Sequence, residues 1–331
     1  MQLVCPAGNL PALRTAIDAG ADAVYAGFRD QTNARAFPGL NFDDDELREG
    51  IAYAHARGRQ VYLALNTYPD SGRLPIWHRA VDHAAELGAD AIIAAEMAVL
   101  DYACRHHPQL PRHLSVQGSA TTAPALRYAF ERFGIARAVL PRVLSVQQVE
   151  RLCQTSPVPL EVFAFGSLCI MVEGRCQLSS YVTGVSPNRH GVCSPASFVR
   201  WEEHADEQRT VRLNGVLIDR FDATEPAGYP TVCKGRYAVG GNIFHALEEP
   251  TSLNTLSLLP RLAEAGVVAL KIEGRQRGAA YVGSVARTWR AAIDAHAKGA
   301  PWQMRPEWEQ TLAAHAEGQQ TTLGAYHRAW H

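Results

Sequence analysis

Short apolar runs rich in β-branched residues alternate with alanine-rich amphipathic stretches along the first half of the chain, as in repeated strand–helix units. The pattern predicts eight strands, at 3–5, 23–26, 60–65, 91–95, 113–116, 138–140, 161–165 and 267–272. Helices are expected over 10–19, 44–57, 77–87, 123–133 and 145–154. Asp43 and Ser145 can cap helix N-termini, and Gly20, Gly58 and Gly134 stand where helices should end.

Four segments of the chain share one pattern, in which the end of a helix is followed by a glycine or short turn and then by an apolar strand. They are AGADAVYAG, LGADAIIAAE, FGIARAVLPR and AGVVALKIEG. Eight repeated units predict an α/β fold of the (β/α)8 type, a TIM-like barrel, because an open doubly wound sheet usually has fewer strands. No glycine-rich phosphate-binding motif follows any strand, which disfavours a dinucleotide-binding domain.

The strand–helix rhythm stops between the seventh and eighth strands. We therefore expect seven βα units over 1–166, an insertion over 167–266, and the last strand, its helix and a C-terminal tail over 267–331. An insertion at this point should emerge at the C-terminal face of the barrel, where such folds place their active sites. The aromatic tail after Pro301 is expected to pack on the barrel or on a partner.

Composition narrows the function classes. The 331 residues are 47% hydrophobic and 20% charged, which is enough to bury a sizeable core. Lys and Arg number 32 against 33 Asp and Glu, so the overall charge does not favour a nucleic acid or a membrane surface as a stable partner. The N-terminus has no basic stretch followed by a long apolar one, and a cytoplasmic protein is expected.

Four of the seven cysteines, Cys169, Cys176, Cys193 and Cys233, fall in the insertion, in loops that contain glycine and proline. An odd number of cysteines in a reducing compartment argues against a disulfide framework. Dispersed thiolates suit an iron–sulfur cluster enclosed by long loops. Structural zinc and simple burial are the alternatives, and the spacing alone does not decide between zinc and a cluster.

The other three cysteines have less specific surroundings. Cys104 and Cys153 lie on predicted helical faces and are expected in the core. Cys5, at the end of the first strand, is expected to point toward the mouth of the barrel, and no role is assigned to it.

Polar side chains at the strand ends are the candidates for chemistry. Lys271 and Glu273 alternate with Ile272, so both should point into the barrel if Ile272 packs toward the helices, either pairing with each other or acting in catalysis. Arg142 and Arg275 follow the sixth and eighth strands and should face the mouth. The candidate catalytic residues are Arg142, Lys271, Glu273, Arg275, Asn66 and Gln117, the last two ending the third and fifth strands.

Two further segments have candidate roles. The loop NARAFPGLNF after the second strand, with Asn33 and Arg35, is a hypothetical lid over the mouth, and packing against the insertion is its alternative. His245 in the insertion is a candidate acid or base.

The stretch EVFAFGSLCIMVEGRCQLS, at 161–179, resembles the signature of the collagenase-like peptidases of unknown catalytic type. Similarity continues through CPAGNLPAL, NARAFPGLNF, SVQGSATT, CKGRY, HALEEPTSLNT, KIEGRQR and TTLGAYHR, and so covers nearly the whole chain. The resemblance implies that Cys169, Cys176, Cys193 and Cys233 bind a 4Fe-4S cluster. The sequence has neither an HExxH motif nor a GxSxG motif, and peptidase activity is not expected.

Within this family the chain resembles a member that acts in ubiquinone biosynthesis. It implies an anaerobic, oxygen-independent hydroxylation of the ubiquinone ring precursor, with prephenate as oxygen donor. It also implies a heterodimer with a related family subunit, UbiV. The two carboxylates of prephenate would call for guanidinium groups, and Arg142 and Arg275 are the candidates. Hydroxylation of an RNA base, as in other relatives, and a non-catalytic cluster-bearing scaffold are the alternatives.

Overall fold

Eight parallel strands close into a barrel in the computed structural model, which describes residues 1–36, 38–169, 171, 176–187, 191–205, 207–299 and 301–327. The strands are β1 (Gln2–Pro6), β2 (Ala23–Ala26), β3 (Gln60–Leu65), β4 (Ala91–Ala94), β5 (Arg112–Leu114), β6 (Arg137–Val139), β7 (Leu160–Ser167) and β14 (Ala269–Ile272). Neighbours pair in this order, and β14 closes the ring by pairing with both β1 and β7. The predicted TIM-like barrel and all eight of its strands are confirmed.

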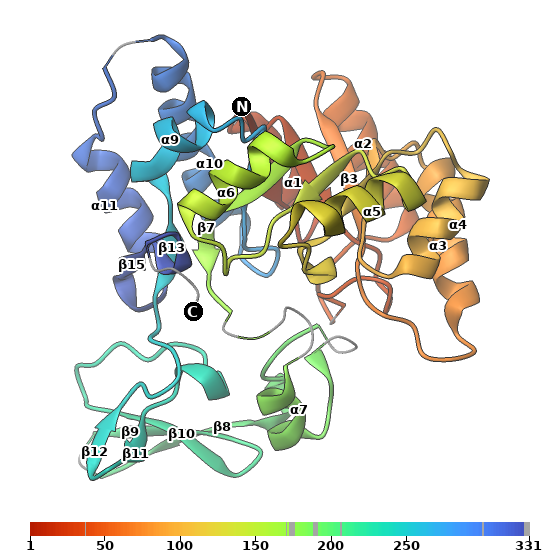
Figure 1. Ribbon diagram of the computed structural model, residues 1–331. Helices are drawn as coiled ribbons and strands as arrows, with labels where there is room; N and C mark the ends of the chain where they lie inside the picture. The colour runs from red at the N-terminus through yellow and green to blue at the C-terminus, as the bar shows by residue number, and fades with distance from the viewer. Residues whose placement is uncertain are drawn as a thin grey trace.

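Helices cover the outside of the barrel (Figure 1). They are α1 (Leu10–Asp18), α2 (Asp44–His55), α3 (Leu74–Glu86), α4 (Met97–His106), α5 (Ala123–Phe133), α6 (Val146–Thr155), α9 (Leu259–Glu264) and α10 (Ala279–Ala297). The five predicted helices are present with ends shifted by at most three residues, and Asp43 and Ser145 both form capping boxes. Helix α4 was not predicted as a range.

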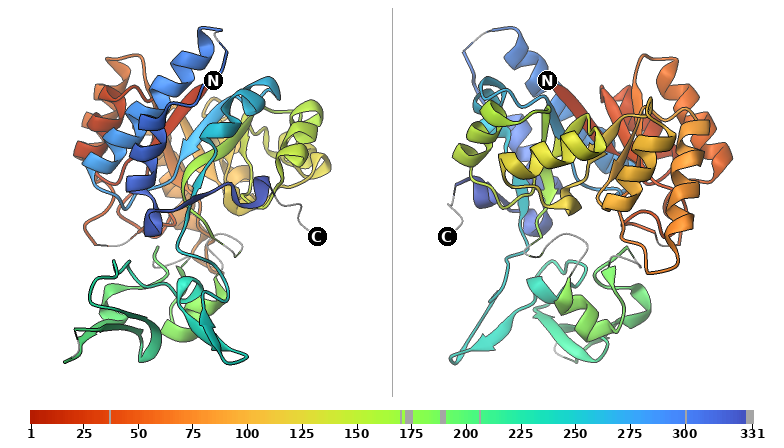
Figure 2. Two further views of the ribbon diagram at one scale, coloured as in Figure 1. Left: turned by 90° about the vertical axis from the view of Figure 1, so that its left-hand side faces the viewer. Right: turned by 45° about the vertical axis from the view of Figure 1, so that its right-hand side comes forward.

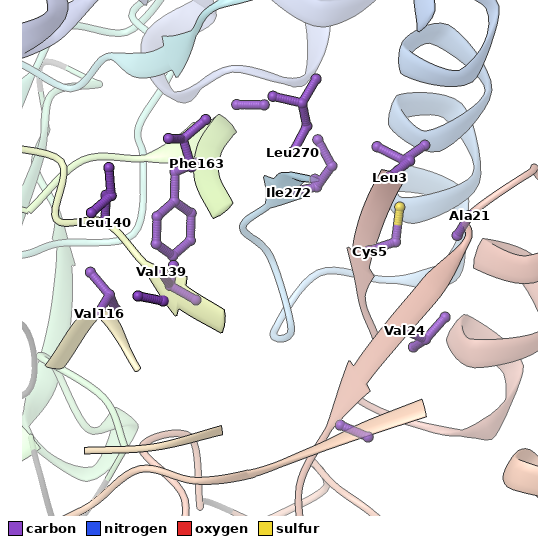
Figure 3. Packing of buried hydrophobic residues seen from close by; sticks show 14 of the residues in the cluster. Leu3, Cys5, Ala21, Val24, Val116, Val139, Leu140, Phe163, Leu270 and Ile272 are labelled. Carbon is purple, nitrogen blue, oxygen red and sulfur yellow. The ribbon is translucent and has the colours of Figure 1, made fainter. Parts of the chain in front are cut away.

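Strand residues alternate between two apolar layers. Val4, Tyr25 and Tyr62 belong to the layer inside the barrel. Leu3 and Cys5 belong to the larger layer between strands and helices (Figure 3). The expectation that Cys5 points toward the mouth is therefore wrong. Because β1 places Val4 inward, its neighbour Cys5 faces the helices, where burial raises the pKa of its thiol.

A separate lobe follows β7 and lies at one end of the barrel (Figures 1 and 2). It consists of α7 (Gln177–Thr183), an antiparallel sheet of β8 (Val199–Glu203), β9 (Arg209–Leu213) and β10 (Val216–Phe221), and a hairpin of β11 (Tyr237–Val239) and β12 (Asn242–Phe244). Its own small core is formed by Val199, Val211, Leu213, Ile218 and Phe221. We call residues 168–250 the cysteine lobe, since it contains all four cysteines of interest.

The chain returns from the cysteine lobe along the barrel. Strand β13 (Ser252–Asn254) pairs antiparallel with the end of β7, and α9 leads back to the start of β14. After α10 come α11 (Pro306–His315) and β15 (Thr321–Thr322), which pairs with β13, and Tyr326 is buried. The tail thus packs on the barrel. No helix in the described ranges is long and apolar enough to cross a membrane.

The packing of α10 gives a test of the fold. Trp289 is completely buried in the layer between the barrel and its helices. Trp289→Ala should lower the free energy of unfolding by about 3–5 kcal/mol, because it removes a large buried ring and leaves a cavity. Urea unfolding followed by circular dichroism measures this. Tyr181→Ala, at a ring that is 93% exposed, is the control and should change stability by less than about 0.5 kcal/mol.

Candidate functional site

The four cysteines of the lobe lie close enough together to affect one another electrostatically. All four are free thiols, partly exposed. Burial raises the pKa of Cys193 to about 11, and Cys169, Cys176 and Cys233 all add to this rise. Burial likewise raises the pKa of Cys233, again with contributions from Cys169 and Cys176. Residues far apart in the sequence are therefore gathered into one group of thiols.

Three of the four cysteines have local contacts that hold them or their segments. Cys176 caps the N-terminus of α7, where its Sγ accepts the N–H of Ser179 at 3.4 Å. The hydroxyl of Ser179 donates to the carbonyl of Cys193, which ties two cysteine segments together. The carbonyl of Cys233 accepts the N–H of Glu248 at 3.0 Å.

The donor set fits an iron–sulfur cluster, since thiolates are the usual cluster ligands. Among the residues that the structure describes, no three His, Cys, Asp or Glu side chains are placed so as to hold one metal ion. Glu173, Gly174 and Arg175, whose backbone amides could approach a sulfur, lie outside the described residues.

A buried ion pair occupies the barrel interior. As the alternation predicted, Ile272 packs against the helices and Lys271 points inward. The partner of Lys271 is Glu161 on β7, with Nζ 2.8 Å from Oε1, and not Glu273. Arg137 also binds Glu161, with Nη1 3.1 Å from Oε2.

The protonation states of the buried groups inside the barrel follow from these contacts. Burial alone would raise the pKa of Glu161, but Lys271 and Arg137 together hold the pKa of this carboxyl below its ordinary value. Burial lowers the pKa of His113 to about 3, so its imidazole is neutral at physiological pH. The Nζ of Lys271 also lies 4.0 Å from the centre of the Tyr25 ring.

Arg275 is a buried guanidinium at the mouth of the barrel. It is 5% exposed, and its Nη1 donates to Oδ1 of Asn33 at 3.1 Å. No carboxylate lies within ion-pair distance of it in the described part of the chain. Burial lowers the pKa of Arg275 to about 10, which leaves it protonated at neutral pH. Among the described residues, its hydrogen-bond partner is a neutral amide, and the Tyr25 ring centre lies 5.8 Å from it, so this buried cation is suited to receive an anionic ligand.

Glu273 lies on the rim between β14 and β7. Its Oε2 accepts the N–H of Ser167 at 3.3 Å, and its Oε1 lies 3.8 Å from Nη2 of Arg35. Gly166 adopts φ +126°, and a Cβ there would lie 2.6 Å from that of Glu273, so only glycine fits. Arg142 stacks on the ring of Phe163 at 4.3 Å and donates to the carbonyl of Ser167.

The other two candidate residues differ in their surroundings. The Oδ1 of Asn66 accepts the N–H of Ala34 at 3.1 Å, which makes Asn66 a support for the loop that follows β2. Gln117 is buried, and its side-chain Oε1 has no hydrogen-bond partner among the described residues. An unsatisfied buried acceptor of this kind can receive a hydroxyl or amine from a ligand.

Arg35 connects the mouth to the cysteine lobe. Its Nη1 donates to the carbonyl of Gly191 at 3.1 Å, and its guanidinium lowers the pKa of Cys193 against the effect of burial. Asn33 is fully buried, and its Oδ1 accepts the N–H of Arg35. This loop therefore packs against the lobe, which is the alternative to the lid hypothesis. His245 is held by the carbonyl of Lys234 at 3.0 Å, beside Cys233.

Two residues of the site were missed by reasoning from sequence. Glu161 lies on β7 in register with Ala269, a residue of the interior layer, so it is the pairing of β7 with β14 that places it inside the barrel. Glu317 contacts Ser167 and Lys234 from the C-terminal tail. No local pattern marks Glu317, because its partners are far away in the sequence.

The chain matches a known protein family and several named proteins. The model of peptidase family U32 matches residues 8–329. The tRNA hydroxylation protein P of Escherichia coli is 31% identical over 325 residues, covering 91% of this chain and 69% of that protein. The chain therefore spans about two thirds of the length of this relative.

Two other relatives have different names. A collagenase of Porphyromonas gingivalis is 29% identical, covering 94% of this chain and 70% of that protein. A 23S rRNA 5-hydroxycytidine synthase of Escherichia coli is 27% identical, covering 89% of this chain and 39% of that protein.

The ion pair in the barrel interior gives a second test. Glu161→Gln leaves Lys271 buried without a carboxylate, so the free energy of unfolding at pH 7 should fall by about 3–5 kcal/mol. Adding Lys271→Met should restore part of this loss, because the buried ammonium is then removed, while Arg137 loses its carboxylate but keeps its hydrogen bond to Gln2. Urea unfolding measures both variants. Equal stability of the single and double variants would contradict the pairing.

The same pair predicts a dependence on pH. The folded-state pKa of Glu161 lies below its ordinary value of 4.5, so its contribution is complete above about pH 4.5 and is lost as the pH falls below it. Between about pH 5 and about pH 3, the double variant should therefore lose less stability than the wild type.

Proposed function

We propose that this chain, which belongs to peptidase family U32, is the iron–sulfur subunit of an oxygen-independent hydroxylase. Cys169, Cys176, Cys193 and Cys233 would hold a 4Fe-4S cluster. The observation that carries the proposal is that contacts hold the four cysteine segments near the barrel mouth. Ser179 joins Cys176 to Cys193, and Glu317 contacts both Ser167, two residues before Cys169, and Lys234, next to Cys233. Relatives named as tRNA and rRNA hydroxylation enzymes support the reaction class.

We infer a cluster in preference to zinc from the dispersion of the thiols together with the family resemblance. A structural zinc ion needs four ligands that converge on one point, at about 2.3 Å for each sulfur. In a four-iron cluster each thiolate binds a different iron, so the sulfurs stand around the cluster and do not converge. Cys169, Cys176, Cys193 and Cys233 are dispersed along the chain and form no close CxxC-like pair, which suits thiolates that stand around a cluster.

We propose the ubiquinone ring precursor as the substrate, as in the ubiquinone hydroxylation protein UbiU, with UbiV as the partner in a heterodimer. The support is the similarity of motifs along nearly the whole chain, from CPAGNLPAL to TTLGAYHR. The near-neutral charge balance is consistent with a substrate that is not a polyanion.

In this proposal the residues at the mouth bind and orient the two reactants. Arg275 would bind a carboxylate of prephenate, with Arg142 on the neighbouring part of the rim as the second guanidinium. Gln117 would accept a hydrogen bond from a hydroxyl of the aromatic ring. Lys271, fixed by Glu161, would keep a positive charge inside the barrel. The cluster supplies electron transfer or Lewis acidity when it is bound.

A second candidate function is hydroxylation of a base in tRNA, because a tRNA hydroxylation protein is 31% identical over most of the chain. The two candidates differ in their substrate and share the cluster and the oxygen donor. Assays with the ubiquinone precursor and with tRNA from a strain that lacks hydroxylated bases separate them.

Iron and sulfide analysis after anaerobic purification tests the cluster. We expect about four irons and four sulfides per chain, with an electron paramagnetic resonance signal on reduction. Replacing any one of Cys169, Cys176, Cys193 or Cys233 by serine should reduce the iron content severalfold, whereas the matched control Cys153→Ser should leave it unchanged. Stoichiometric zinc in the wild type would overturn the assignment.

Arg275→Lys tests the anion site. Lysine keeps the positive charge but cannot offer the two parallel donors of a guanidinium. If Arg275 binds a carboxylate of the oxygen donor, kcat/KM for that donor should fall about 10- to 100-fold. This is the equivalent of one charged hydrogen bond. Arg48→Lys, at an exposed position on α2, is the control. Unchanged kinetics with full cluster content would instead support the scaffold alternative.

A further inference from the structure

We propose that Glu317, in the C-terminal tail, is a positioning residue that holds two of the four cysteine segments at the barrel mouth. One carboxylate contacts the chain beside Cys169 and the chain beside Cys233. The inference rests on the proposed function only in treating these cysteines as cluster ligands. The contacts themselves are independent of any bound group.

The first contact fixes the segment that contains Cys169. The hydroxyl of Ser167 donates to Oε1 of Glu317, and Ser167 is the last residue of β7. Cys169 follows two residues later, where the chain leaves the barrel. The position of Cys169 therefore depends on how firmly the end of β7 is held.

The second contact fixes the segment that contains Cys233. Lys234 follows Cys233 in a short 3-10 turn, η3 (Val232–Lys234), and its ammonium forms an ion pair with Oε2 of Glu317. The side chain of Lys234 is only 11% exposed, so the cation is largely removed from water. A buried cation of this kind is destabilising without its carboxylate. Removing the carboxylate of Glu317 should therefore release the turn that contains Cys233.

Glu317 itself is fixed to the barrel, so it can act as an anchor. Its backbone N–H donates to Oγ of Ser252 at 2.9 Å, and the tail pairs with β13 a few residues later. Gly318, at φ +57°, packs so closely on the carbonyl of Pro250 that a Cβ would lie 2.5 Å from that oxygen. Arg277 lies 3.9 Å from the same carboxylate and adds a second cation.

The other two cysteines have separate supports. Cys176 and Cys193 are joined through Ser179, and the Cys193 segment is bound to the barrel by the contact of Arg35 with Gly191. Loss of Glu317 should therefore affect Cys169 and Cys233 selectively. A general unfolding of the lobe would affect all four.

The experiment measures thiol alkylation in metal-free protein, resolved for each cysteine by mass spectrometry. In Glu317→Gln, Cys169 and Cys233 should react about 5- to 10-fold faster than in the wild type, while Cys176 and Cys193 react at wild-type rates. Glu309→Gln, at an exposed position in α11, is the matched control and should change no rate. Lys234→Met also removes a cation that lowers the pKa of Cys233, so this variant serves as the background for a double-variant test. Adding Glu317→Gln to Lys234→Met should give no further acceleration at Cys233.

A second readout uses the reconstituted protein. Glu317→Gln should lose iron to a chelator several times faster than wild type and the Glu309→Gln control. Wild-type alkylation rates at Cys169 and Cys233, or equal acceleration at all four cysteines, would overturn the role of Glu317. If the wild type binds no iron and sulfide, the proposed function fails, but the selective alkylation still decides whether Glu317 positions these segments.

Discussion

The pairing of β7 with β14 closes the barrel and determines where everything between these two strands must lie. The two strands are parallel, so the chain leaves β7 at the mouth and must reach the opposite end before β14 begins. It returns by β13, which runs antiparallel beside the end of β7, and then by α9. The topology thus confines the cysteine lobe to the mouth before any side-chain contact is considered.

Because β7 and β14 pair, their buried charged residues lie at two levels, inside the barrel and at its rim. Glu161 on β7 and Lys271 on β14 meet inside the barrel, where both side chains are buried. At the rim, Arg275 is left with a neutral amide as its partner among the described residues. A barrel that satisfies its interior charge and leaves a buried guanidinium at the mouth favours an anionic ligand there.

The sequence predicted the barrel well because its strands carry a strong local signal. Each strand is a short apolar run, and alternation around Ile272 placed Lys271 inside the barrel. It failed for Cys5, because the position of a strand end does not reveal on which face a residue lies. It also missed the partner of Lys271, since Glu161 is 110 residues away and no local pattern links them.

The cysteine segments lie between two cores that are already complete. The lobe has an apolar core built from β8, β9 and β10, and no cysteine contributes to it. The barrel core likewise contains none of the four lobe cysteines. A group bound by these thiols would therefore join two formed cores, in contrast to small zinc domains in which the metal replaces a core. Its removal should loosen the contact between lobe and barrel and leave both cores folded.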